Sequence, residues 1–133
     1  MVDTVDSTVI LNTLGQSERY VIHLTNESDG TGESGVIKVN ISDFLLASGS
    51  APTTTTVNSI HYSIGGFNYV VVEWEHTTND EIAVLSGNGL LEFTGFGGKD
   101  DPSSTGGAGD IVLTTDGSVD GGHYDILLDI TMA

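Results

Sequence analysis

Cysteine is absent from this 133-residue sequence, which excludes disulfides, thiol catalysis and cysteine-ligated zinc. Proline is scarce, with two residues, and no apolar run approaches the length of a transmembrane helix. The first ten residues hold no basic residue and no long apolar segment, so the sequence predicts no signal peptide. We therefore expect one domain, residues 1–133, with a core large enough to fold without covalent cross-links.

Basic residues are also scarce. The sequence has three, Arg19, Lys38 and Lys99, against 19 acidic residues, which gives a formal net charge of −16. A groove for DNA or RNA needs a basic footprint, so nucleic-acid binding is excluded and anionic membranes are disfavoured. A solvated acidic exterior is the simplest interpretation, although a cationic partner or Ca²⁺ would relieve the self-repulsion.

Glycine, by contrast, is abundant, with 18 residues, and the chain alternates apolar and polar positions along many short runs. Alternation is typical of half-buried strands, and turn-forming residues separate the runs. We predict an all-β antiparallel β-sandwich of eight or nine short strands, with jelly-roll connections as one option. Residues 1–17, with a weakly alternating run from Thr8 to Leu14 closed by Gly15, are predicted to be an N-terminal arm or an edge strand.

Several local features are predicted from the pattern. The alternating runs predict three sets of residues on one strand face each: Tyr20, Ile22 and Leu24; Val70, Val72 and Trp74 facing the core; and Tyr124, Ile126, Leu128 and Ile130 pointing inward. Val57–Ile64 and Tyr69–Glu75, joined through Gly65 and Gly66, indicate a central hairpin. Ser42 is expected to cap a single helical turn that extends to Ala47. Residues 94–109 form the longest irregular segment, which is typical of a functional or mobile loop.

The loop from Asn26 to Gly35 joins two alternating runs, and we expect Ile37, Val39 and Ile41 to share one face of the second. Acidic residues and glycines in such a loop predict either a ligand site or a contact tip. Carboxylates here and in other loops make a structural calcium ion conceivable, without an EF-hand pattern. These calcium candidates are Glu27, Asp29, Glu33, Asp100, Asp101, Asp116 and Asp120.

Catalytic patterns are weak. No nucleophile elbow or phosphate-binding loop occurs. Glu73 and Glu75 share a strand face, as glycosidase carboxylates can, but a solvated face explains them as well. We therefore predict that the chain is not an enzyme.

The four histidines lack paired metal-binding spacing. His23 and His61 are expected on polar strand faces, while His76 and His123 are expected at strand ends, exposed or in turns. Three aromatic residues could instead form an exposed sugar-binding patch, or could fill the ends of the sandwich. They are Phe67, Tyr69 and Phe96.

One block of the sequence resembles a known family. Residues 19–34 read RYVIHLTNESDGTGES, and residues 36–41 read VIKVNI. This block resembles small virion proteins of tailed phages, many of them marine, that carry a similar T-N-x-S-D-G-T-G-E-S run before a strand. Further matches, together covering about four-fifths of the chain, are SIHY (59–62), LEF (91–93), FGG (96–98), GDI (109–111) before Thr114 and Thr115, and GHYDILL (122–128). Members of that family tend to end in basic residues, whereas Asp129–Ala133 does not, so the resemblance does not extend to a charged contact of the tail.

The resemblance implies a non-enzymatic capsid decoration, or cement, protein on the outside of the shell, assembled in the host cytoplasm. Its partners would be the major capsid protein and copies of itself, as a symmetric homo-oligomer such as a trimer. Stabilisation would come from burying on the order of 1,000 Å² or more across joints between subunits. Expected contact residues are Asp29, Thr31, Glu33, Phe96, Lys99 and Asp100. The alternatives are a sugar-binding tail or surface module and, last, a calcium-stabilised enzyme domain.

Overall fold

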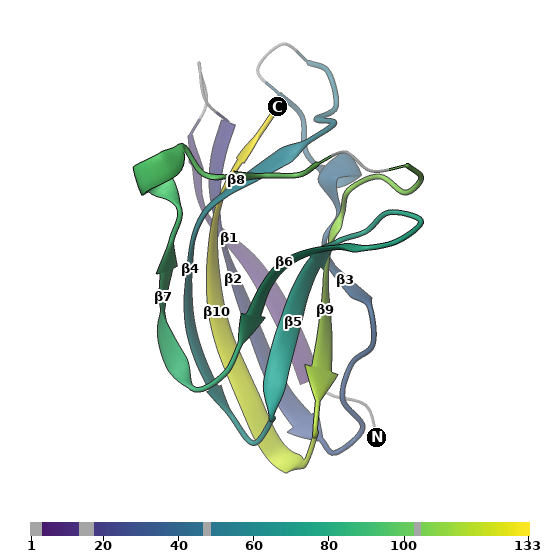
Figure 1. Ribbon diagram of the computed structural model, residues 1–133, viewed down its shortest axis with the longest axis vertical. Coiled ribbons are helices and arrows are strands. Elements are labelled where there is room, and N and C mark those ends of the chain that lie inside the picture. Colours follow the sequence, from purple (N-terminus) through teal and green to yellow (C-terminus); the bar gives the residue numbers. More distant parts are fainter. Residues whose placement is uncertain (1–3, 14–17, 47–48, 103–104) are drawn as a thin grey trace.

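Two antiparallel β-sheets pack face to face in the computed structural model (Figure 1). It describes residues 4–13, 18–46, 49–102 and 105–133, with the backbone alone described for 4–13 and 18. The larger sheet has the order β1-β2-β10-β4-β7, with β8 also paired to β4. The smaller sheet has the order β3-β9-β5-β6. The predicted all-β sandwich is confirmed, whereas the jelly-roll connection stays a prediction.

The bounds of the elements follow the alternating runs. The larger sheet is built from β1 (Thr4–Thr13), β2 (Glu18–Asp29), β4 (Thr55–Gly65), β7 (Asn88–Glu92), β8 (Lys99–Asp100) and β10 (Asp120–Met132). The smaller sheet is built from β3 (Val36–Val39), β5 (Tyr69–Trp74), β6 (Asp80–Leu85) and β9 (Ile111–Asp116). Two single turns of 3₁₀ helix, η1 (Ile41–Asp43) and η2 (Thr94–Phe96), complete the described part. Neither is long enough to cross a bilayer, and the described ranges hold no longer helix.

The core lies between the sheets and uses the predicted inward positions. On β10 the inward residues Tyr124, Ile126, Leu128 and Ile130 are all buried. Each such side chain contributes roughly 1.5–3 kcal/mol through its removal from water. From the smaller sheet, Trp74 is buried and its Nε1–H donates to Thr55 Oγ1 over 2.8 Å. Because Thr55 begins β4, this hydrogen bond links the two sheets inside the core.

The predicted central hairpin is wrong in its pairing. β4 pairs with β10, β7 and β8, while β5 pairs with β6 and β9, so the two strands belong to different sheets. Gly66, with φ of +80°, allows the chain to cross from one sheet to the other. Each strand has one buried face, and alternation alone cannot say which strand pairs with which.

Two local predictions also need correction. The register shifts between Ile37 and Val39, so Ile37 is 45% exposed while Val39 is buried. Ile41 is buried too, but in η1 rather than in a strand. The turn is capped by Asn40, whose side chain accepts from the Ser42 amide, rather than by Ser42. Ala47, the predicted end of this turn, lies outside the described residues.

The N-terminal segment forms the edge strand that was one of the two predicted options. β1 pairs with β2 alone, from Thr4 opposite Glu27 to Thr13 opposite Arg19. Leu14 and Gly15, the predicted end of this run, lie outside the described residues. At the other end of the sequence, β10 occupies the middle of the larger sheet, between β2 and β4.

Candidate functional site

A histidine and two aspartates meet where two segments distant in the sequence run side by side. His76 lies in the turn between β5 and β6, Asp80 begins β6, and Asp101 follows β8. Backbone hydrogen bonds join the two segments: Thr77 N–H donates to Thr105 O over 3.0 Å, and Gly109 N–H donates to Glu75 O over 3.0 Å. We call His76, Asp80 and Asp101 the His76 cluster.

The imidazole of His76 is held at both ring nitrogens. Nδ1 lies 2.7 Å from the carbonyl oxygen of Gly106, which can only accept, so Nδ1 carries a proton. Nε2 lies 2.8 Å from Asp101 Oδ1 and 3.8 Å from Asp80 Oδ2. The side chains of His76 and Asp101 are 5% and 1% exposed, so the imidazole meets the Asp101 carboxylate in a space that water scarcely enters.

Burial and hydrogen bonding act in opposite directions on His76. Burial lowers its pKa, while the Gly106 carbonyl, the hydrogen bond to Asp101 and the charges of Asp101 and Asp80 raise it. The net result is a pKa above the ordinary histidine value. An imidazole that donates from both nitrogens is the charged form, which balances part of the negative charge of the two aspartates.

The sequence did not reveal this cluster. His76 was expected to be an exposed or turn histidine, and its place in a turn is correct, but the residue is buried. A histidine and an aspartate four positions apart were the only local signal. Asp101 was counted among the loop carboxylates without any indication that it would approach His76, because that approach depends on the pairing of β8 with β4.

The loop from Asn26 to Gly35, expected to be a ligand site or a contact tip, is partly built into the fold. Glu33 is buried, and its carboxylate accepts from Lys38 Nζ and, over 2.7 Å, from Tyr124 Oη. Its backbone N–H donates to Thr115 Oγ1 over 2.8 Å, and its carbonyl accepts from Thr115 N–H over 3.0 Å. Glu33 is therefore part of the scaffold, since this buried charge is already paired.

The expected calcium residues do not gather into one site. Within the described ranges, the His76 cluster is the sole group of three His, Asp or Glu side chains with donor atoms within 4.8 Å of one another. Glu27 is exposed, and Asp29 and Asp120 lie opposite each other in the register of β2 and β10. The carboxylate of Asp116 accepts a hydrogen bond from the side chain of Asn68. The loops do carry many carboxylates, but within the described ranges the topology gathers no three of the expected calcium residues at one place.

The remaining expected contact residues differ in how free they are. Phe96 is 72% exposed on η2, and Asp100 is exposed while accepting from Thr56 Oγ1 over 2.6 Å. Thr31 is exposed and folds back onto Asp29. Lys99, however, is half-buried and donates to the carbonyl of Ile82 over 2.7 Å, which braces β8 against β6. Phe96 and Asp100 are the members of this set best placed to contact a neighbour.

The expected aromatic patch does not form. Phe93, which packs against Phe96, donates its backbone N–H to Asn58, near the start of β4. Phe67 and Tyr69 follow the end of the same strand at Gly65. At about 3.3 Å per residue, these two places lie roughly 20 Å apart along β4.

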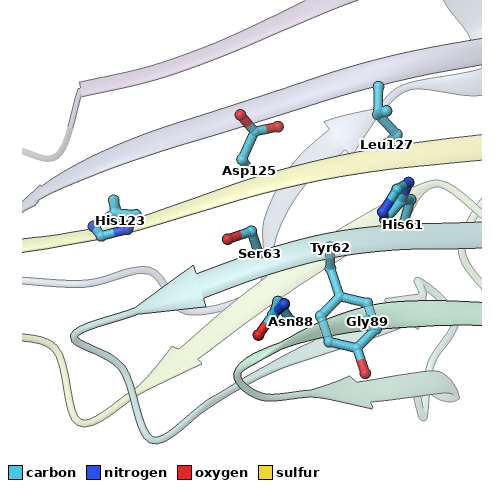
Figure 2. A pocket seen from close by; sticks show the side chains of 8 residues that line it. All are labelled: His61, Tyr62, Ser63, Asn88, Gly89, His123, Asp125 and Leu127. Carbon is cyan, nitrogen blue, oxygen red and sulfur yellow. The ribbon is translucent and has the colours of Figure 1, made fainter.

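A shallow hollow of about 440 Å³ lies on the outer face of the larger sheet. Figure 2 shows side chains from β4, β7 and β10 around it, with Tyr62 beside Gly89 and directed away from His61. A Cβ on Gly89 would come 3.0 Å from Tyr62 Oη, so glycine makes room for this ring. The lining offers both polar and apolar surface and consists of His61, Tyr62, Ser63, Asn88, Gly89, His123, Asp125 and Leu127.

The outer face of the smaller sheet is rich in apolar side chains. Val70, Val72 and Trp74 point into the core, so the alternate residues of β5 point outward. Residues directly opposite in antiparallel strands share a face, which places Val84 beside Val71 and Ile37 beside Val112. Tyr69, Ile37 and Val84 are 39%, 45% and 51% exposed. We call Ile37, Tyr69, Val71 and Val84 the apolar face. Val112 points to the same side but is fully buried, and Glu73 and Glu81, directly opposite each other in β5 and β6, place two carboxylates among the apolar side chains.

Comparison with known proteins adds no identity to these sites, because no family model, curated protein or solved structure matches the chain.

Proposed function

We propose that this chain is a non-enzymatic structural protein of a tailed-phage virion that decorates the outer capsid shell and stabilises it. The apolar face of the smaller sheet carries the proposal. Exposed apolar side chains that gather on one sheet favour burial against another protein surface. Such a surface works by packing and assigns no catalytic role to Glu73 or Glu75.

The phage-like sequence block supports the same role. Its residues form nearly all of β2, the loop that contains Glu33, the whole of β3 and the start of η1, so the block carries the chain from the larger sheet to the smaller one. Glu33, Lys38 and Tyr124 tie this passage to β10. A sequence block that resembles a family and lies in this connection between the sheets would preserve the fold and not a catalytic site, which fits a structural protein.

The proposed partners are the major capsid protein and copies of this chain, arranged as a trimer on the capsid exterior after assembly in the host cytoplasm. The net charge of −16 favours the outside of the particle, because packaged DNA would repel an acidic protein. Phe96 and Asp100 on the η2–β8 segment are proposed as additional contacts.

Mass spectrometry and a cryo-EM map of purified particles test the proposal directly. The expected result is a copy number comparable to that of the major capsid protein, with density on the outer shell. A handful of copies at the tail or neck, or no copies at all, would overturn it.

Binding to empty shells that lack the protein gives a sharper test of the apolar face. Val84→Asp is expected to abolish binding, because it places a charge in a surface that must lose its water. Leu90→Asp is the matched control, since Leu90 is 54% exposed but lies on the larger sheet opposite His61. Equal loss in both variants would contradict a specific role for the apolar face.

Sugar binding is the second candidate, and the hollow on the outer face of the larger sheet favours it. Ser63, Asn88 and Asp125 offer hydroxyl, amide and carboxylate groups that hydrogen-bond to sugar hydroxyls. A glycan array would show a defined specificity that Asn88→Ala removes and Val84→Asp leaves intact. An array without any signal would remove this candidate.

A further inference from the structure

The His76 cluster places three donor atoms close together on two segments that are otherwise held by backbone hydrogen bonds. One nitrogen and two carboxylate oxygens lie within 4.8 Å of one another. The three side chains come from positions 76, 80 and 101, so the arrangement depends on the tertiary fold and not on a local sequence run.

The imidazole is oriented as metal-binding histidines usually are. In metal sites the nitrogen that does not bind the ion commonly donates to a backbone carbonyl or a carboxylate, which fixes the ring and its tautomer. Nδ1 of His76 donates in this way to Gly106 O over 2.7 Å. Nε2 is left directed at the two aspartates.

The carboxylates are also placed for more than a single hydrogen bond. Asp80 Oδ2 is buried and has no hydrogen-bond partner, although the side chain as a whole is 27% exposed. Such a buried oxygen is costly unless it meets a donor or a cation. Gly109, with φ of +77°, leaves the space beside Asp101 open, because a Cβ there would come 2.5 Å from Asp101 Oδ2.

We propose that His76, Asp80 and Asp101 bind a divalent transition-metal ion, with zinc as the preferred metal. Zinc accepts mixed nitrogen and oxygen ligands in a four-coordinate site, and three protein ligands leave one position for water. Calcium is a poorer fit, since it takes six to eight oxygen ligands and has little use for imidazole. The proposal does not depend on the virion role, because it concerns the chain by itself.

A metal in this place would cross-link the β5–β6 turn to the segment that follows β8. In the metal-free chain, the proton on Nε2 fills part of the same role by bridging His76 and Asp101. The ion would take the position of that proton and would also engage Asp80. The net charge of −16 adds a general attraction for a divalent cation.

Isothermal titration of the chelator-treated chain with ZnCl₂ tests the proposal. We expect saturable binding of one zinc per chain and a melting temperature that rises with free zinc. In long-range ¹H–¹⁵N spectra, zinc should shift the ring nitrogens of His76 and leave those of His61 and His123 in place. Calcium at the same concentration should not compete.

Two variants separate this site from adventitious binding. Asp80→Asn keeps the shape of a partly exposed side chain and should weaken zinc binding by about tenfold or more. Glu81→Gln, on the exposed neighbouring residue of β6, should leave binding unchanged, as should His61→Gln. Because Asp80 is not part of the core, its variant is expected to fold, which circular dichroism would verify.

Absence of saturable zinc binding to the folded chain would overturn the proposal. So would binding that Asp80→Asn retains, or binding that His61→Gln removes, since either result would place the metal elsewhere.

Discussion

At the scale of single residues, the most consequential contact is the buried ion pair between Glu33 and Lys38. Their side chains are 4% and 3% exposed, and Tyr124 donates to the same carboxylate. Lys38→Met should destabilise the fold by about 3–5 kcal/mol, because it leaves a buried carboxylate without its cation. Urea unfolding would measure the loss.

Two comparisons check the cause of that loss. Tyr124→Phe removes one hydrogen bond to the carboxylate and should cost less, about 1–3 kcal/mol. The double variant Glu33→Leu with Lys38→Met removes both charges and should recover much of the stability lost in Lys38→Met. A double variant as unstable as the sum of its single changes would indicate that packing, not charge, causes the effect.

Asp129 supplies a prediction about pH. Its hydrogen bonds with Arg19, at 2.5 and 2.9 Å, hold its pKa below the ordinary value, against the opposing effect of burial. The stabilisation is therefore complete above the ordinary aspartate pKa of about 3.9 and is lost as the pH falls through the lower pKa of the folded state. Arg19 is 48% exposed, so the contribution should stay below about 1 kcal/mol.

The measurement is a comparison of wild type with Asp129→Asn in urea at several pH values. Wild type should be the more stable at neutral pH, and the difference should vanish at strongly acidic pH. A difference that persists there would mean that the substitution disturbs packing and not the ion pair.

At the scale of elements, the crossing from β4 to β5 depends on glycine. Gly66 has φ of +80°, and a Cβ there would lie 2.5 Å from Gly122 Cα. Gly66→Ala should destabilise the fold by more than about 2 kcal/mol, since left-handed strain adds to a clash with backbone. Thermal or urea unfolding would measure the change.

Gly87, between β6 and β7, is the matched control. Its φ is +65°, and an added Cβ would meet nothing within 4 Å. Gly87→Ala should therefore cost only the conformational strain, about 1–2 kcal/mol. Equal losses at Gly66 and Gly87 would contradict a role for the close approach to Gly122.

The sequence predicted strands far better than it predicted their partners. Alternation identified β2, β5 and β10 and their inward residues, because burial of one strand face is a local property. It assigned β4 and β5 to one hairpin, because two adjacent alternating runs with glycines between them fit either a hairpin or a crossing between sheets. The bulge after Ile37 could not be predicted for the same reason, because it appears only in the register between β3 and β9.

The candidate site was less predictable than the strands. His76 and Glu33 are polar residues in turns, where exposure is the usual expectation. Each is buried because a partner far along the chain, Asp101 for one and Tyr124 for the other, supplies a hydrogen bond. No spacing rule within one sequence brings such partners together; the strand order does.

At the scale of the whole molecule, charge sets the response to salt. With 19 acidic residues against three basic ones, folding concentrates negative charge. Screening should reduce this repulsion, so the melting temperature should rise between low ionic strength and about 0.15 M sodium chloride, where the Debye length is about 8 Å. A melting temperature that falls with salt would show that the few ion pairs outweigh the general repulsion.

The central place of β10 has a consequence for how the molecule is made. β2 and β4 emerge from the ribosome long before β10, yet neither can bond to the other, because β10 lies between them. Until β10 is synthesised, the nascent chain exposes the unpaired edges of β2 and β4. Unpaired strand edges make a chain prone to aggregation. Closure of the larger sheet must wait for the last of the described strands, so the fold is expected to form late and as a unit, at the slow rates typical of long-range β pairing.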